Sequence, residues 1–79
     1  PLSLRLDLPS KPVLVAGAEL RLKQDGDRLA IIYRGAKVGE LKAQLSQRIL
    51  KCLAQGYRYP GTVQAVAGGG QYGEFKRAS

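Results

Sequence analysis

Apolar residues in this chain recur at every second position in short runs, and glycine or proline ends most of these runs. In the first run Leu2, Leu4, Leu6 and Leu8 alternate with polar residues, and Pro9 follows. A period of two places alternate side chains on one face of a strand, so this run predicts a half-buried strand. The same kind of pattern predicts further strands near residues 19–23, 29–33, 37–39, 62–66 and 72–76.

One segment follows a helical period instead. Leu41, Leu45, Ile49 and Leu53 are spaced by four residues, and lysine, arginine and glutamine cover the other side. Gly56 comes directly after the last apolar turn, where a glycine commonly ends a helix. The spacing predicts one amphipathic helix over about residues 41–55, with Leu45, Ile49 and Leu53 buried.

These elements predict a mostly β, β-rich α+β fold: a small OB- or SH3-like barrel, or a rolled sheet, with one amphipathic helix. Asp25-Gly26-Asp27 and Gly35 predict tight turns, and the triple glycine at 68–70 predicts a hairpin loop. With 79 residues the chain is one domain, 1–79. Because it opens at Pro1, we expect a fragment of a longer protein or a processed chain, whose other domains are candidate partners.

The charge is unevenly distributed along the chain. The net charge is +7, from 13 basic and 6 acidic residues. Residues 1–27 hold four bases and four acids, which sum to zero, so residues 28–79 hold nine bases against two acids and carry the whole excess. This asymmetry predicts a basic face and an anionic partner.

The residue types that are scarce narrow the function. Histidine is absent and Cys52 is the single cysteine, so we expect no metal site, no cofactor and no enzyme activity. Cys52 has no histidine to activate it and lies toward the end of the expected helix, which predicts an inert residue in or beside the core. One cysteine forms no internal disulfide, so we expect a reducing, intracellular location, in the nucleus or in a bacterial cytoplasm. No apolar run reaches about 18 residues, so we expect no membrane span.

Aromatic and basic residues are interleaved in the second half. The groups are Tyr33-Arg34, Tyr57-Arg58-Tyr59 and the segment from Tyr72 to Arg77. Aromatic faces stack on unpaired bases while Arg and Lys hold phosphates, so the pattern favours binding of single-stranded DNA. The candidate binding residues are Tyr33, Arg34, Lys37, Lys42, Arg58 and Tyr59.

Two other interpretations stay open from the same residues. With only five aromatic residues, some of the rings must pack the core. The domain could also be a protein-interaction module that pairs a partner strand with an exposed sheet edge near Tyr72–Lys76.

The order of several short motifs resembles the HIRAN domain family. Within Arg28–Ile32, Leu29-Ala30-Ile31 stands where that family reads Asn-Ala-Ile, and Gly35–Leu41 matches Gly-x-x-x-Gly-x-Leu ahead of a helix and a further strand. The resemblance covers about residues 17–66. It implies a small OB- or SH3-like barrel and a non-catalytic DNA-binding module of a DNA-processing protein, which in the best-known members captures a single-stranded 3′ end.

Few of the family's pocket residues have counterparts here. Asp27 matches the Asp of a family Tyr-Asp pair, and Lys42 lies one position from a family lysine. The other pocket positions differ. In this chain Gly26 stands where the family has the Tyr, and Leu29 where it has the Asn. Glu40 stands where the family has an aromatic residue or His, and Ala43 where it has the lysine. The resemblance therefore implies the fold and general DNA affinity, and we expect that blocking a 3′ hydroxyl matters little.

Overall fold

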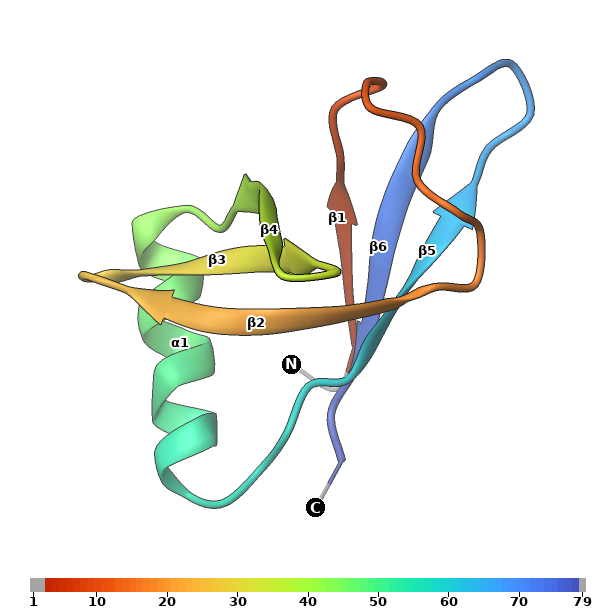
Figure 1. Cartoon of the computed structure of the whole chain (residues 1–79). Coiled ribbons are helices and arrows are strands. Elements are labelled where there is room, and N and C mark those ends of the chain that lie inside the picture. Colours follow the sequence, from red (N-terminus) through yellow and green to blue (C-terminus); the bar gives the residue numbers. More distant parts are fainter. Residues whose placement is uncertain (1–2, 79) are drawn as a thin grey trace.

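A computed structural model describes residues 3–78 and shows a mostly β fold with a single helix, α1, as the sequence predicts. Six antiparallel strands form one curled sheet in the order β1-β6-β5-β2-β3-β4 (Figure 1). The elements are β1 Ser3–Asp7, β2 Glu19–Asp25, β3 Arg28–Tyr33, β4 Ala36–Glu40, α1 Ala43–Ala54, β5 Gly61–Ala65 and β6 Gln71–Lys76. Leu2, which we expected to begin the first strand, lies outside the described residues.

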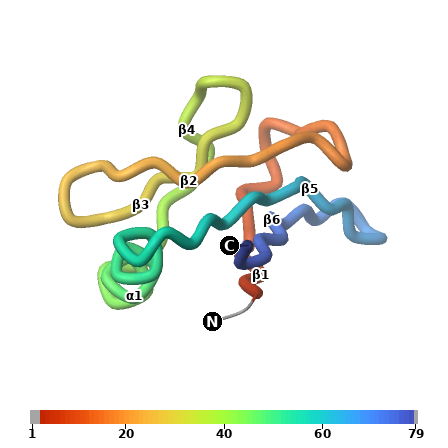
Figure 2. Tube along the Cα trace, turned by 90° about the horizontal axis from the view of Figure 1, so that it is seen from below, coloured from red at the N-terminus to blue at the C-terminus, as the bar shows by residue number. Residues whose placement is uncertain are grey.

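The sheet curls because β2 belongs to both of its halves. Glu19 and Leu20 pair with β5, and the rest of the strand, from Arg21 onward, pairs with β3. The result is a half-barrel, and Figure 2 shows its open outline from one end. The two outer strands approach through side chains: a Cβ atom on Gly39 of β4 would lie 3.6 Å from Leu8, just after β1.

The core lies inside this curl and follows the period of two. Leu20, Leu29, Ile31, Val63 and Phe75 are almost completely buried. The Phe75 ring occupies the space beside two strand glycines, one on β5 and one on β6, where a Cβ atom would collide with it. The five aromatic residues thus include at least one pure core residue.

Helix α1 is shorter and less buried than the spacing predicts. Leu41 is buried, but its N–H donates to the Leu29 carbonyl at 2.9 Å, so it extends the sheet edge rather than the helix. Ile49 is fully buried, whereas Leu45 and Leu53 are only half-buried, so their expected burial is wrong. Among the strands, β3 makes the most extensive contact with α1, and the helix covers the core with only part of its apolar side.

Most of the expected turns are confirmed, but the expected sheet edge is wrong. Gly26 joins β2 to β3 with φ 65°, and the glycines at 68 and 69 form the loop between β5 and β6. The final strand exists as β6, yet it pairs with β1 on one side and β5 on the other. Tyr72–Lys76 is therefore central, because the first strand of the chain covers it.

None of the helical structure within residues 3–78 is long and apolar enough to cross a bilayer. Over the same residues, no three His, Cys, Asp or Glu side chains gather as metal ligands.

Candidate nucleic-acid interface

Lys37, one of the predicted binding residues, lies in a network of ion pairs on β2, β3 and β4. Its Nζ lies 2.7 Å from Glu40 Oε2 and 3.2 Å from Asp25 Oδ2, and Arg28 Nη1 lies 3.1 Å from Glu40 Oε1. The hydrogen bond to Glu40 is the main cause that raises the pKa of Lys37, and the hydrogen bond to Asp25 is the second. The hydrogen bond from Lys37 is the main cause that lowers the pKa of Glu40, and the one from Arg28 is the second. We call Asp25, Arg28, Lys37 and Glu40 the neutral cluster, since its two cations and two carboxylates cancel.

Tyr33 and Arg34 are brought together at the turn between β3 and β4. The Arg34 guanidinium lies 5.3 Å from the Tyr33 ring centre, and the Tyr33 hydroxyl accepts a hydrogen bond from the Val15 N–H at 3.3 Å. Arg34 has a φ of 50°, a left-handed conformation that is uncommon outside glycine. Arg34 lines one hollow and Arg58 lines another, and the two hollows are neighbours because Glu19 and Arg21 line both of them.

Tyr59 is a core residue, which corrects its predicted role in base stacking. Its side chain is only 5% exposed and belongs to the cluster of buried apolar residues. Burial, followed by a hydrogen bond with Cys52, raises the pKa of Tyr59. A ring whose faces are covered by the core has no face to offer a base.

The three other tyrosines are half-buried, and each is covered by an arginine of this chain. Arg5 lies 4.0 Å from the ring centre of Tyr72, and Arg77 lies 4.4 Å from that of Tyr57. Sequence adjacency identified the Tyr33 partner, whereas the partner of Tyr57 comes from the far end of the chain. Stacking a base on these rings would require displacing the protein's own guanidinium groups.

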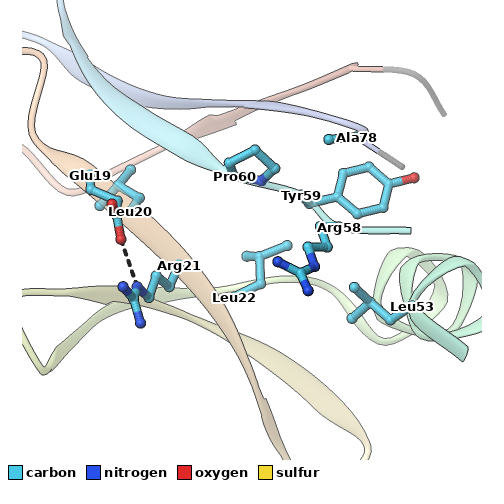
Figure 3. A pocket seen from close by; sticks show the side chains of 9 residues that line it. All are labelled: Glu19, Leu20, Arg21, Leu22, Leu53, Arg58, Tyr59, Pro60 and Ala78. Carbon is cyan, nitrogen blue, oxygen red and sulfur yellow. Dashed lines mark hydrogen bonds and ion pairs between the residues drawn. The ribbon is translucent and has the colours of Figure 1, made fainter. Parts of the chain in front are cut away.

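Arg58 lies at a groove between β2 and the end of α1, with a volume of about 560 Å³. Figure 3 shows the Arg58 side chain turned toward Leu22 and Leu53, and the Tyr59 ring turned the other way. Arg21 lines the same groove, but its Nε lies 2.6 Å from Glu19 Oε1. Of the two guanidinium groups at the groove, Arg58 is therefore the one whose charge no described carboxylate compensates.

Five of the nine cations that form no ion pair within residues 3–78 lie on or beside α1; the other four are spread over the rest of the described chain, and they are Arg5, Lys11, Lys23 and Arg34. From residue 41 to residue 73 the sequence holds no Asp or Glu. Backbone hydrogen bonds of 2.7 and 2.8 Å between Arg58 and Ala78 bring Arg77 to the same end of the helix. We define the α1 basic surface as Lys42, Arg48, Lys51, Arg58 and Arg77. Within residues 3–78 none of these five residues forms an ion pair.

Two of the predicted binding residues, Lys42 and Arg58, belong to this surface. Lys42 precedes α1 and lines a shallow hollow together with Arg48. Sequence analysis missed Arg48, Lys51 and Arg77. The absence of acidic residues between Glu40 and Glu74 could have identified the first two, but nothing local in the sequence brings Arg77 to the helix.

Cys52 has activating partners that the sequence did not reveal. The side chain is half-buried, and a hydrogen bond with Tyr59 lowers its pKa, with a smaller contribution in the same direction from Arg77. The prediction of an inert cysteine without partners is therefore wrong in its premise, because the fold brings both groups to the last turn of α1.

In comparisons with known proteins, no family model, no curated protein and no solved structure matches this chain. The resemblance to the HIRAN family stays a prediction.

Proposed function

We propose that this domain is a non-catalytic DNA-binding module that contacts its ligand through the α1 basic surface. The observation that carries the proposal is the segregation of charge: five cations without a described ion pair lie on and beside one helix, and the stretch from residue 41 to residue 73 holds no acid. The sequence also lacks histidine and has a single thiol, which favours a binding role over catalysis.

The physical basis of binding is the release of counterions from DNA. Each phosphate that a Lys or Arg neutralises frees condensed cations, and the affinity then falls with salt. Four other cations are less available for such contacts. They are Arg21, Arg28, Lys37 and Lys76, which lie within 4.0 Å of the carboxylates of Glu19, Asp25, Glu40 and Glu74.

A salt titration tests the proposal. Fluorescence anisotropy with labelled oligonucleotides gives the slope of log K against log salt. If all five cations meet phosphates, we expect a slope of about −4.5 for duplex DNA or about −3.5 for a single strand. Arg58→Ala should reduce the magnitude of the slope by about one contact and weaken all sequences alike.

Lys23→Ala is the matched control for Arg58→Ala. Lys23 is an exposed cation on β2 and lies outside the α1 basic surface, so its loss removes the same charge elsewhere. We expect it to leave the slope nearly unchanged. Absence of salt-dependent binding to any oligonucleotide at low salt would refute the proposed function.

That result would favour the alternative of strand pairing at a sheet edge. Since β6 is central, the available edges are β1 and β4. The β4 edge has a register shift near Ile31 and Ile32 and carries Lys37 and Glu40. Bulges and charges are features that protect an edge from pairing, so β1 is the edge that this alternative would use.

A further inference from the structure

The outward side of α1 carries a single stripe of hydrogen-bonding side chains. Gln44, Arg48, Lys51 and Gln55 are exposed and lie at spacings of four, three and four residues. Gln47 lies beside them, but its amide already donates a hydrogen bond to the Asp27 carbonyl at 3.1 Å. Residues at these spacings fall on one face of a helix. No carboxylate interrupts the stripe, and the helix has no acidic residue in its first turn.

The opposite side of α1 is fixed to the sheet. Ile49 is fully buried, and the Ser46 hydroxyl accepts a hydrogen bond from the Leu29 N–H at 3.0 Å and donates to the Leu41 carbonyl at 3.4 Å. Figures 1 and 2 both show α1 at the flank of the molecule, with one side turned away from the strands. The stripe is thus held rigidly on a projecting element.

From these observations we infer that α1 enters the major groove of duplex DNA and reads base edges with its outward stripe. This inference rests on the proposed DNA-binding function. The major groove, about 12 Å wide, admits a helix, and there Arg bonds guanine while Gln bonds adenine in bidentate pairs. From Gln44 to Gln55 the helix rises about 16 Å, close to five base pairs.

The ends of the helix supply the contacts that position it. Lys42 precedes the first turn, and Arg58 and Arg77 lie beyond the last one. Cations at both ends of a helix lying in the groove meet phosphates of the DNA backbone, which fix register without reading sequence.

The arrangement of the tyrosines favours duplex over single-stranded DNA as the ligand. Binding of a single strand depends on open aromatic faces. In this fold Tyr59 is buried, and Tyr33, Tyr57 and Tyr72 each have an arginine of the same chain within 5.3 Å of the ring centre. The helix, in contrast, presents its polar stripe without rearrangement.

Selection from a randomised 20-base-pair duplex library tests the inference. The full chain should enrich a short motif of about five base pairs. Arg48→Ala should reduce discrimination at one position of that motif by roughly 5- to 150-fold, the value of one bidentate pair. Gln44→Ala should relax another position and leave the salt slope unchanged, because it removes no charge.

Lys23→Ala again serves as the control, with an unchanged motif expected. All substituted side chains are exposed, and circular dichroism verifies that each variant is folded. Tighter binding to the selected duplex than to either of its strands, with the motif altered by Arg48→Ala and Gln44→Ala, supports the inference. Equal binding of single and double strands, or a motif that neither variant changes, overturns it while the DNA-binding function stands. No salt-dependent binding to any DNA overturns both.

Discussion

The neutral cluster and the α1 basic surface are both rich in cations, yet they differ in what those cations are free to do. In the neutral cluster, Lys37 lies between the carboxylates of Asp25 and Glu40, 3.2 and 2.7 Å away. On the α1 basic surface, Arg48 and Lys51 project from a helix without acidic neighbours in the sequence from residue 41 to residue 73. The net charge of the whole chain, +7, does not reveal this difference.

The difference teaches that strand pairing decides which charges remain available. Asp25 pairs with Arg28 across the β2–β3 hairpin, and β4 folds back to add Lys37 and Glu40 to the same face. A helix followed by an acid-free segment has no such cross-strand partners. The basic half of the sequence therefore becomes a neutral sheet edge and a cationic helix.

The largest expected effect concerns Tyr59. It follows Arg58 in the sequence, but it is buried in the core, whereas Arg58 lies at the surface groove. Tyr59→Ala should destabilise the fold by about 3–5 kcal/mol, because it removes a buried aromatic ring. Thermal unfolding followed by circular dichroism should show a drop in Tm on the order of 15 °C or more. Tyr59→Phe keeps the ring and serves as the control, and an equally small loss from both substitutions would show that the ring is outside the core.

A double charge reversal compares the cations of α1 with those of β2 directly. Arg48→Glu with Lys51→Glu should lower DNA affinity at low salt on the order of 100-fold, because repulsion replaces phosphate contacts. Arg21→Glu with Lys23→Glu changes the charge equally on β2 and should cost far less. Both are measured by anisotropy at one salt concentration, and equal losses would mean that DNA responds to net charge rather than to the α1 basic surface.

Cys52 gives a pH-dependent prediction at the end of the same helix. Since hydrogen bonds with Tyr59 and then Arg77 lower its pKa, the pH–rate profile of alkylation by iodoacetamide should have its midpoint below the ordinary value of 9.0. Tyr59→Phe should move the midpoint upward, and Arg77→Ala should move it less. A group with a lowered folded pKa adds stability above its unfolded pKa and loses it as pH falls through the folded value. A midpoint that neither substitution moves would contradict the contacts.

Most of the fold was predictable because its signals are local. Alternating leucines and the Asp25-Gly26-Asp27 turn each specify a strand or hairpin through neighbouring residues. The position of β6 was not predictable in this way, since its pairing with β1 joins the two ends of the chain. The same holds for Leu45 and Leu53, whose burial depends on how much of the helix the sheet reaches.

The candidate site was predicted less well than the fold, for a related reason. Lys42 and Arg58 were chosen from the pattern of basic and aromatic residues in the sequence, but Lys37 was chosen without knowledge of its partners across the strands. Tyr59 and Tyr57 look alike in sequence, two positions apart, yet the first is buried and the second is covered by Arg77. Pairings between distant segments determine both outcomes.

The turn beyond β3 offers a smaller test, one of stability alone. Arg34 and Gly35 have φ values of 50° and 84°, the conformation of a type I′ turn, for which Asn-Gly is favoured. Arg34→Asn should therefore stabilise the fold by about 0.5–1 kcal/mol, seen as a higher urea midpoint. DNA affinity should change little, because Arg34 is not a member of the α1 basic surface; a marked loss would add Arg34 to the interface.

The smallest expected effect is that of Lys37→Gln. Arg48→Gln removes the same charge from the α1 basic surface, so the two variants compare that surface directly with the neutral cluster. Because Lys37 is held by Glu40 and Asp25, its loss should change DNA affinity by less than about twofold and leave the salt slope intact. Arg48→Gln should reduce the magnitude of the slope by about one contact. Equal slopes for the two variants would mean that DNA breaks the ion pairs of the neutral cluster and uses Lys37 after all.

The pH dependence of stability provides an independent check on the same lysine. Glu40 has a pKa lowered from 4.5, so its contribution is present above that value and is lost as pH falls through the folded pKa. Lys37 has a pKa raised from 10.5, so its contribution is present below that value and is lost as pH rises through the folded pKa. Lys37→Gln should remove the contribution of Lys37 at the alkaline limit completely, and should reduce that of Glu40 at the acid limit only in part, because Arg28 still lowers the pKa of Glu40. A profile identical to that of the parent chain would show that these ion pairs do not persist in solution, and Lys37 would then be as available to DNA as Arg48.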